Sequence, residues 1–552
     1  MSPIAAGLLQ AGFLIALLAI AHVPLGRYMA WIATSEHHNR VERAIYRVCG
    51  VDPDREQSWR HYARGLIGFS LAGILLLYLL LRLGPLLPLS YGRDAFPADG
   101  AFNTAISFVT NTNWQWYSGE ILGHVPQMLG LTVQNFVSGA VGICVAFALI
   151  RGFARSRTDQ LGNFFVDVTR VSLRLLLPMA FVVAVLLILG GAVQSWAAGL
   201  DVTTFAGGSQ HVPLGPVASQ EAIKQLGTNG GGFFNANGSH PFENPNALTS
   251  VLAIWAMTVI PFSLPYTFGK MIGDRRQGIA IVLVMAILQF GAMAITLSSE
   301  LAHRGSALMA AGAAMEGKEQ RFGIWGSVLY GSASTGTSTG AVNSMHDSYT
   351  AAGGGTLMLN MMLGEVSPGG VGTGLYGILV VAVLTVFLAG LMVGRTPEYL
   401  GKSIGRREIT PVALYILAMP FALLCGAAIT LLLPGGAQTL QDAGPHGLSE
   451  ILYAYTSASN NNGSAFAGFG AASILHTVGT GLAMLIGRFV PIVLALSLAG
   501  ALAKQGHAEE NSGTFPTHGP LFITLIIGII LIVAALTFFP ALALGPIAEA
   551  LL

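Results

Sequence analysis

The stretch SQEAIKQLGTNGGGFFNANGSHPFENP, residues 219–245, lies between two long apolar runs yet holds little that suits hydrocarbon. Its first third can form a short helix, which the glycine-rich run from Gly227 to Gly232 then breaks. Glycine adopts backbone angles that other residues resist, so this loop can turn its carbonyl groups in one direction. Irregular backbone at membrane depth persists only where protein buries it or where it lines a water-filled path. The stretch therefore predicts a short helix and an ion-dehydrating loop set between two membrane spans.

The composition of the chain is that of a membrane protein. Of its 552 residues, 53% are hydrophobic and only 10% are charged, whereas a soluble domain carries about 25% charged residues. The net charge of +1 gives no reason to expect nucleic acid or an acidic partner. The three cysteines lie far apart, show no metal or redox spacing, and are expected to be small buried residues.

Apolar runs of membrane-spanning length recur along the whole chain. The first, from about Ile4 to Leu25, has no basic start and no cleavage signal, so we expect a retained span and not a signal peptide. The further runs begin near Tyr62, Val125, Val168, Asn246, Gly278, Thr373, Val412, Ser473 and Leu521. The sequence thus predicts an all-α polytopic membrane protein with about ten transmembrane helices.

Basic residues are concentrated in alternate connections between these spans. Of the 27 Lys and Arg residues, 20 lie at residues 27–64, 151–174, 270–276 and 395–407 and at Lys504. The opposite connections contain only Arg82, Arg93, Lys224, Arg304, Lys318 and Arg321. The positive-inside rule then places the first loop in the cytoplasm and both termini outside. The segments rich in Gly, Asn and Thr all fall in the external connections.

The four long external connections share one order of parts: a short amphipathic helix, a small polar break, and a return to apolar sequence. They occupy residues 101–115, 220–234, 322–344 and 448–470. The breaks are Thr110-Asn111-Thr112-Asn113, Thr228-Asn229-Gly230-Gly231, Thr335-Gly336-Thr337-Ser338 and Ser459-Asn460-Asn461-Asn462-Gly463. A repeat of span, short helix, loop and span every roughly 100 residues predicts a pseudo-fourfold pore, with one extra helix at each end. The expected units are 1–61 (first span and basic loop), 62–150, 151–276, 277–408 and 409–504 (pore repeats), and 505–552 (last span).

Four such loops around one axis can strip a cation of its water. Backbone carbonyls replace that water when a loop holds them at suitable spacing, and each short helix directs its partly negative carboxyl end toward the axis. The hydroxyls of Thr110, Thr228, Thr335 and Ser459 can add oxygens, and Gln115 is expected near the outer mouth. The alternative is that these are external turns that bind nothing. Their recurrence on one membrane face favours the pore, and the lack of a G-x-x-x-x-G-K-[ST] motif argues against a phosphate loop.

Two charged residues are candidates for the ion path. Arg488 lies inside the ninth apolar run, where a charge is costly. It either satisfies carbonyls of a broken helix or forms an electrostatic barrier below the loops. Glu365, in MLGEVSPGG ahead of the seventh span, either lines the path or caps a helix.

The segments TNTNWQ, GTNGGGFFNAN with SHPFENP, STGTSTG and SNNNGSAFAG resemble the four filter segments of the potassium-transporting A subunit of Kdp P-type ATPases, and the resemblance covers essentially the whole chain. That family is related to the Trk, Ktr and HKT transporters. The resemblance implies a subunit that selects external K⁺ and passes it sideways, through an intersubunit tunnel, to a B subunit that hydrolyses ATP. A C subunit and a small F peptide would complete the complex in the bacterial inner membrane. It implies no covalent cofactor, and ATP used only by the partner.

The predicted potassium site follows from the breaks and from this resemblance. It comprises Thr110, Asn111, Thr112, Asn113, Thr228, Asn229, Gly230, Gly231, Thr335, Gly336, Thr337, Ser338, Asn460, Asn461, Asn462 and Gly463, with Gln115 at the mouth and Arg488 and Glu365 on the ion path. No catalytic residue is expected, since the chain has no D-K-T-G-T phosphorylation motif. A self-sufficient Trk- or Ktr-like channel or symporter is the alternative; a membrane enzyme is disfavoured because no H-E-x-x-H or G-x-S-x-G motif occurs in the external loops.

Overall fold

The computed structural model describes residues 3–302, 315–394, 396–508 and 515–552, so Arg304 and Arg395 of the charge pattern lie outside the described residues. Within these ranges, ten helical segments are long and apolar enough to cross a membrane, which confirms the predicted number. They are α1 (Pro3–Thr34), α3 (Trp59–Arg82), η3 with α5 (Pro126–Thr132 and Val133–Ala154), α6, η4 and α7 (Phe164–Arg170, Val171–Leu176 and Leu177–Leu189), α9 (Ala247–Met271), α10 (Arg275–Leu301), α13 (Thr373–Met392), α14 (Arg406–Leu432), α16 (Ile474–Lys504), and α17, η9 and α18 (Pro520–Leu542, Ala543–Ile547 and Ala548–Leu551).

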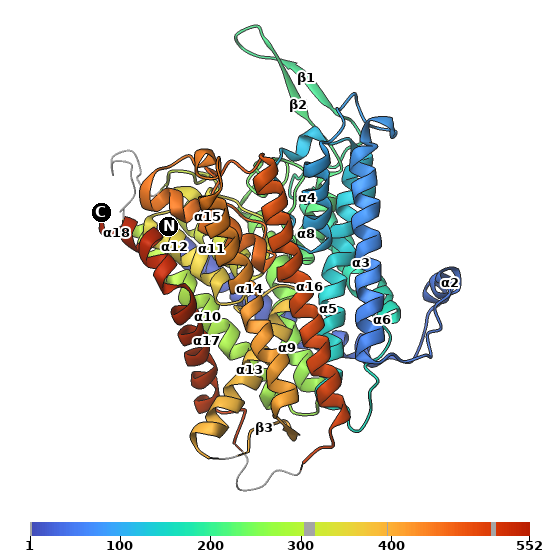
Figure 1. Cartoon of the computed structure of the whole chain (residues 1–552). Coiled ribbons are helices and arrows are strands. Elements are labelled where there is room, and N and C mark those ends of the chain that lie inside the picture. Colours follow the sequence, from blue (N-terminus) through green and yellow to red (C-terminus); the bar gives the residue numbers. More distant parts are fainter. Residues whose placement is uncertain (1–2, 303–314, 395, 509–514) are drawn as a thin grey trace.

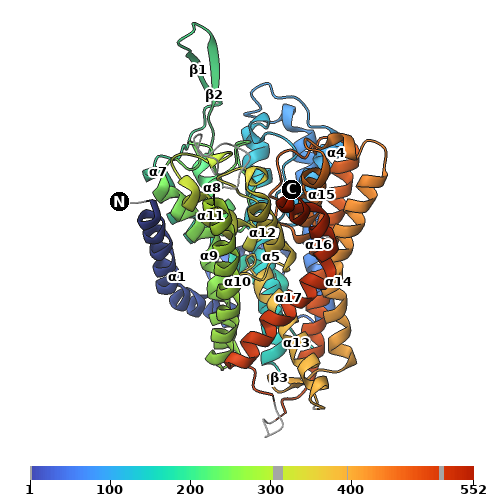
Figure 2. The ribbon, with the colours of Figure 1, turned by 90° about the vertical axis from the view of Figure 1, so that its left-hand side faces the viewer.

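Four shorter helices stand between pairs of spans, as the repeat predicted. They are α4 (Ala98–Val109), α8 (Val217–Leu226), α11 (Gly323–Gly336) and α15 (Gly444–Asn460). All four lie toward the same end of the bundle, and both chain termini lie toward that end as well (Figures 1 and 2). The repeats are therefore α3–α4–α5, α7–α8–α9, α10–α11–α13 and α14–α15–α16, with α1 and α17 as the extra helices. The prediction of an all-α fold with four pore repeats is confirmed.

Burial separates the inner helices from the outer ones. Every residue of α5 from Ser138 to Phe153 is buried, so this helix passes through the middle of the protein. In contrast, α1 and α17 are apolar on all sides and largely exposed, as expected for helices that face lipid. Side-chain caps fix where several spans begin: Asn246 accepts from the N–H groups of Leu248 and Thr249 at the start of α9.

Several elements were not predicted from the sequence. The basic first loop contains helix α2 (Arg40–Cys49), and the segment after α11 contains helix α12 (Ala351–Met362). Strands β1 (Gly199–Thr203) and β2 (Ser209–Pro213) form an antiparallel hairpin that projects from the end of the molecule carrying the short helices (Figure 1). Strands β3 (Glu398–Tyr399) and β4 (Lys402–Ser403) make a small second pair. Single turns complete the chain at η1 (Gly84–Leu86), η2 (Gly119–Ile121), η7 (His346–Ser348) and η8 (Ala437–Thr439).

The cysteines follow the prediction only in part. Cys144 is buried in α5, as expected, whereas Cys49 and Cys425 are exposed. The expectation is wrong for these two because Cys49 ends the peripheral helix α2 and Cys425 lies on an exposed side of the membrane-spanning helix α14.

Candidate functional site

Each of the four short helices ends in the same backbone conformation. The residue that turns the chain has a positive φ: 66° at Asn111, 47° at Thr228, 58° at Ser338 and 59° at Asn461. The N–H of the next residue donates to the carbonyl five residues earlier in each case, in the pairs Thr112–Ser107, Asn229–Lys224, Thr339–Ser334 and Asn462–Ser457. Loops of four different sequences thus share one geometry. They are named here loop one (residues 110–113), loop two (227–230), loop three (337–340) and loop four (460–463).

A positive φ is uncommon for any residue other than glycine, and for a β-branched residue it is strained. Thr228 is the β-branched case, and its hydroxyl is held by the N–H of Val371, which donates to Thr228 Oγ1 over 3.0 Å. Strain of this kind costs about 1–3 kcal/mol per residue and is found where the surrounding structure enforces it, often at functional sites. The occurrence of a positive φ at the same position of all four loops marks these loops as the candidate site.

The four loops contact one another in a closed ring. Asn111 Nδ2 donates to Thr228 O (3.0 Å), which joins loops one and two. The Gly340 N–H donates to Asn229 O (3.1 Å), which joins loops two and three. The remaining contacts are from Ser338 Oγ to Asn460 O (3.1 Å) and from Asn461 Nδ2 to Thr112 Oγ1 (2.9 Å). Segments more than 300 residues apart therefore surround one axis.

The ring consists of buried, uncharged oxygen-rich groups. All residues of the four loops are buried except Asn460 and Gly463, which are half-buried, and every side chain among them is that of Thr, Asn, Ser or Gly. Asn113 Oδ1 and Asn229 Oδ1 are buried and accept no hydrogen bond from the described residues. A buried acceptor without a partner is unfavourable unless something else binds it. This chemistry suits a weakly hydrated cation.

The structure places the predicted residues of loop one in the ring, and those of loop four except Ser459, which lies inside α15 and donates its hydroxyl to Thr456 O. Loops two and three differ from the prediction as well. Thr335 and Gly336 belong to the last turn of α11, and Thr339 and Gly340 stand in the loop in their place. Loop two begins one residue earlier than predicted, at Gly227, and Gly231 follows it. The repeated Thr and Gly residues of STGTSTG do not indicate where the helix ends. The end is set by the N–H of Thr339, which donates to the carbonyl of Ser334.

Three serines that support the loops were missed by the sequence reasoning. Ser107 Oγ donates to Trp114 O (2.9 Å), Ser334 Oγ donates to Ala341 O (2.6 Å), and Ser457 Oγ accepts from the Gly463 N–H (2.8 Å). Each lies four residues before the residue with positive φ, inside its short helix. That common spacing was the signal in the sequence that could have aligned loop three correctly.

Gln115 lies between loops one and two, near the predicted outer mouth. Its Oε1 accepts from the N–H of Gly232 (2.9 Å), so it holds the two segments together. Behind loop two, Glu221 and Lys224 form an ion pair, and both residues are buried. Lys224 Nζ also donates to Asn237 Oδ1 (2.5 Å), and Asn237 Nδ2 donates to Gly230 O. This network fixes the outer side of loop two.

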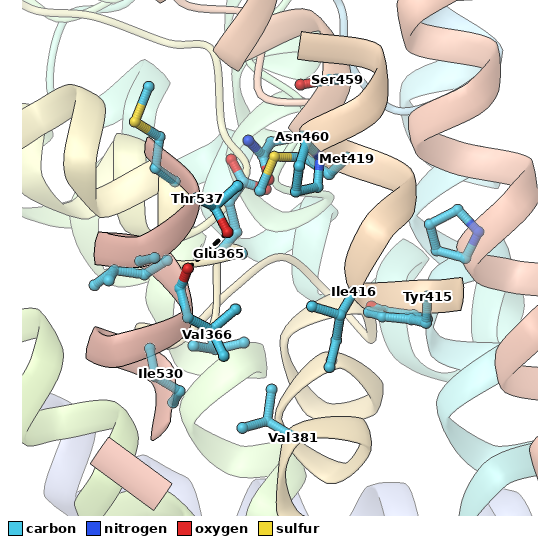
Figure 3. A pocket seen from close by; sticks show the side chains of 18 of the residues that line it. Glu365, Val366, Val381, Tyr415, Ile416, Met419, Ser459, Asn460, Ile530 and Thr537 are labelled. Carbon is cyan, nitrogen blue, oxygen red and sulfur yellow. Dashed lines mark hydrogen bonds between the residues drawn. The ribbon is translucent and has the colours of Figure 1, made fainter. Parts of the chain in front are cut away.

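Glu365 contacts loops three and four directly. Its carboxylate accepts from Asn462 Nδ2 (3.0 Å) and from Ser338 Oγ. The alternative that it caps a helix is wrong, because α13 begins after Gly372 and α12 ends at Met362. Glu365 also lines a cavity of about 110 Å³ that lies between α13, α14 and α17 beside Asn460 (Figure 3). Its remaining lining is mostly apolar and includes Val381, Ile416, Met419 and Ile530.

Arg488 is buried in α16 on the side of loop one. Its Nη2 donates to the carbonyl of Ser138 in α5 (3.0 Å), and Ser138 Oγ donates to Asn111 Oδ1 (2.7 Å). The guanidinium therefore satisfies a helix carbonyl, which is the first of the two roles considered for Arg488 from the sequence.

Comparisons with known proteins agree over nearly the whole chain. The family model described as "Potassium-transporting ATPase A subunit" matches residues 12–551. Proteins called potassium-transporting ATPase potassium-binding subunit are similar: that of Clavibacter sepedonicus is 59% identical over 99% of both chains, and that of Kineococcus radiotolerans is 57% identical over 100% of this chain and 99% of its own. The crystal structure of the potassium transporter TrkH from Vibrio parahaemolyticus superposes with a TM-score of 0.52 at 15% identity, over 89% of this chain and 96% of that one. The last likeness concerns the fold alone.

Proposed function

The chain belongs to the family of potassium-transporting ATPase A subunits, and on this premise we propose that it is the potassium-binding subunit of an ATP-driven K⁺ uptake pump. It selects external K⁺ and does not itself hydrolyse ATP. The observation that carries the proposal is the closed ring of four loops with one backbone geometry and uncharged oxygen-bearing side chains.

Selection in such a ring depends on oxygens held at fixed spacing. Carbonyl and hydroxyl oxygens of the four loops replace the hydration shell of the ion, and a rigid ring does so better for K⁺ than for the smaller Na⁺. The short helices point their partly negative carboxyl ends toward the loops, which favours a cation over an anion. The proposed site takes in the residues predicted from the sequence and adds Gly227, Thr339 and Gly340; of the predicted residues, Gly231, Thr335 and Gly336 flank the loops and do not lie within them. Gln115 positions the outer side of loops one and two.

The ion then leaves toward the cavity beside loops three and four. Glu365 lies between those loops and the cavity and offers a carboxylate to a departing cation, whereas the charge of Arg488 opposes passage straight on toward the cytoplasm. We propose that the ion's path runs through this cavity between α13, α14 and α17 and leaves the bundle sideways. This arrangement suits delivery to a partner subunit in the same membrane.

The partners follow from the family. We assign ATP hydrolysis to a P-type B subunit, and we expect a C subunit and a small F peptide to complete the complex. The chain needs K⁺ as its transported ion and no covalent cofactor.

We place the chain in the bacterial inner membrane with both termini and the four short helices outside, because the basic connections gather at the opposite end. We propose that the four pore repeats begin at about residues 62, 151, 277 and 409.

The alternative of a self-sufficient Trk-like transporter is not favoured. Its support is the shared fold, at 15% sequence identity, and that fold is also the one expected of the pump subunit.

The test is ATP hydrolysis by the purified chain, alone and with its co-purifying partners, titrated with K⁺ and Na⁺. We expect activity only with the partners, stimulated by K⁺ and not by Na⁺. Passive K⁺ flux into liposomes containing this chain alone, with no co-purifying ATPase, would instead establish the Trk-like alternative.

A further inference from the structure

Helix α2 (Arg40–Cys49) carries three different faces. Residues three or four apart lie on the same side of a helix, so the arginines at positions 40, 43 and 47 form one stripe. Val41, Ile45 and Val48 form a second stripe beside it. Glu42 and Tyr46 form the third face, and these two are buried while the three arginines are exposed. A short helix with adjacent basic and apolar stripes is typical of segments that lie in a membrane interface.

The buried face fixes α2 to the edge of the bundle. Glu42 forms an ion pair with Arg174 (2.6 Å between Oε1 and Nε), and the helix lies beside α6 at the periphery, away from α13 and α17 (Figure 1). The connection that contains it joins the end of α1 to the start of α3, both of which are membrane spans. Tyr28 and Trp31 near the end of α1 and Trp59 at the start of α3 are the aromatic residues expected at the headgroup level.

Among the described residues, the other two faces are largely exposed, and only Ile45 of these two stripes is half-buried. Val48 is 86% exposed and Val41 is 58% exposed. The side chains of Arg40 and Arg47 make no ion pair or hydrogen bond with any described residue, and Arg43 Nε donates only to His38 O (3.1 Å). The only carboxylate of the helix, Glu42, is already paired with Arg174. The charged groups elsewhere in this connection are Glu36, Asp52, Asp54, Arg55 and Glu56 and, when protonated, His37 and His38.

We propose that α2 lies in the headgroup layer of the cytoplasmic leaflet and that its arginine stripe binds anionic phospholipid. The orientation in this proposal is that of the proposed function. The cytoplasmic leaflet is negatively charged and attracts clustered Lys and Arg next to membrane spans. The valine stripe enters the boundary between headgroups and acyl chains, while the arginines contact the lipid phosphates in two-pronged hydrogen bonds. A bilayer is the occupant that matches both stripes, because it offers apolar and anionic surface side by side at this depth.

Cys49, exposed at the end of α2, allows a direct test. In the purified complex, the Cys425→Ser variant of this chain is labelled at Cys49 with an environment-sensitive fluorophore, while the Cys49→Ser, Cys425→Ser variant measures labelling elsewhere. The complexes are placed in nanodiscs of phosphatidylcholine with increasing phosphatidylglycerol. We expect nitroxide-labelled lipid to quench the probe increasingly as phosphatidylglycerol rises, and aqueous iodide to lose access to it.

The matched comparison is between two pairs of exposed arginines on the same side of the membrane. Arg40→Gln with Arg47→Gln should lower the lipid quenching at a fixed phosphatidylglycerol fraction, because each lost arginine weakens binding to the anionic surface by on the order of fivefold. Arg406→Gln with Arg407→Gln, at the start of α14, should leave it unchanged. A probe that stays accessible to iodide at every lipid composition overturns the proposal. So does lipid quenching that is the same in both double variants, or a probe that neither quencher reaches, because a protein partner then covers α2.

The same samples separate this proposal from the proposed function. Potassium-stimulated ATP hydrolysis by the nanodisc complex reports on the pump alone, since α2 is remote from the four loops. Labelling of Cys49 by a membrane-impermeant reagent in intact right-side-out vesicles would contradict the cytoplasmic placement, whatever the lipid result.

Discussion

Loops one and two are held together by neutral side chains, whereas loops three and four share a carboxylate. In the first pair, Asn111 donates to the carbonyls of Gly227 and Thr228, and Asn111 Oδ1 accepts from Ser138 and Asn229. In the second pair, Glu365 accepts from Ser338 and Asn462. The backbone of the four loops is the same, so the two halves differ in their support and not in their conformation.

The difference shows that the loop geometry does not require a particular set of side chains. The positive φ and the bond to the carbonyl five residues earlier recur in all four loops, while the groups behind them vary. The carboxylate is on the side where the cavity opens between α13, α14 and α17. We interpret the neutral half as the part that only binds the ion and the charged half as the part from which the ion leaves.

The largest expected effect is that of Gly230→Asp in loop two, which belongs to the neutral half. Gly230 has a φ of 95°, and a Cβ there would lie 2.1 Å from the backbone nitrogen of Gly340, so the contact between loops two and three is lost. Left-handed strain together with an uncompensated buried carboxylate costs several kcal/mol, and we expect the K⁺ concentration for half-maximal ATP hydrolysis to rise at least about 100-fold. Gly207→Asp, at a φ of 79° with open space around it, is the matched control. Unchanged discrimination between K⁺, Rb⁺ and Na⁺ in Gly230→Asp would remove loop two from the site.

Asn111→Asp tests the neutral half by giving it a charge. A carboxylate cannot donate to the carbonyls of Gly227 and Thr228, and it would face both of them in a buried place. Because each unsatisfied buried group costs about 1–3 kcal/mol, we expect a loss of K⁺ affinity of about 10- to 100-fold, measured by the same titration. An affinity equal to that of the unchanged complex would mean that loops one and two do not depend on this amide.

Glu365→Gln makes the reverse change in the charged half. Glutamine keeps the shape but offers one acceptor oxygen in place of two, so either Ser338 or Asn462 loses its acceptor. Hydrogen bonds to charged groups are worth about 1.5–3 kcal/mol, and we expect about a tenfold fall in the maximal rate of K⁺-stimulated ATP hydrolysis. The K⁺ affinity should change less than in Asn111→Asp. If affinity falls and the maximal rate does not, the assignment of binding and release to the two halves is wrong.

The smallest expected effect is at the outer end of α15, which carries loop four. His446 lies with Nδ1 2.9 Å from Glu549 and Nε2 3.0 Å from Asp347, and hydrogen bonds to these two carboxylates raise its pKa to about 10. A raised pKa in the folded state means stability that is complete below the ordinary histidine pKa and is lost as the pH rises through about 10. We expect His446→Gln to destabilise the complex by about 1 kcal/mol near neutral pH and to match the unchanged complex above about pH 10.

Thermal unfolding at the two pH values measures this effect. His211→Gln, which removes an exposed pair with Asp201 in the β1–β2 hairpin, is the control and should change neither midpoint. A His446→Gln midpoint that is lowered equally at both pH values would show that the histidine acts through packing and not through charge.

Much of this fold could be predicted from the sequence because membrane spans are set by apolar length and the loops by unusual polar residues. The ten spans, the four short helices and the polar breaks all have strong local signals. The exact register of loop three has no strong local signal, because Thr335 and Gly336 are chemically similar to Thr339 and Gly340. The end of the helix depends instead on a backbone hydrogen bond to Ser334.

Other features depend on contacts between distant segments. Nothing near Glu365 in the sequence indicates that it meets Ser338 and Asn462, and the same local sequence is compatible with a helix cap. The three arginines of the ten-residue segment that forms α2 predict a basic loop. The spacing of Glu42 and Tyr46, which are four residues apart, instead indicates a buried helical face. The β1–β2 hairpin could have been found from the Gly207-Gly208 turn that follows the β-branched run Val202-Thr203-Thr204.

The most direct test of the central claim is the position of the ion itself. The structure of the complex in Rb⁺ or Tl⁺, with anomalous scattering used to identify the ion, should show a bound cation inside the ring formed by Asn111, Thr228, Ser338 and Asn461. Gly230→Asp should abolish or displace that density. An ion found only elsewhere in the complex, with the ring of four loops empty under conditions that support ATP hydrolysis, would contradict the account.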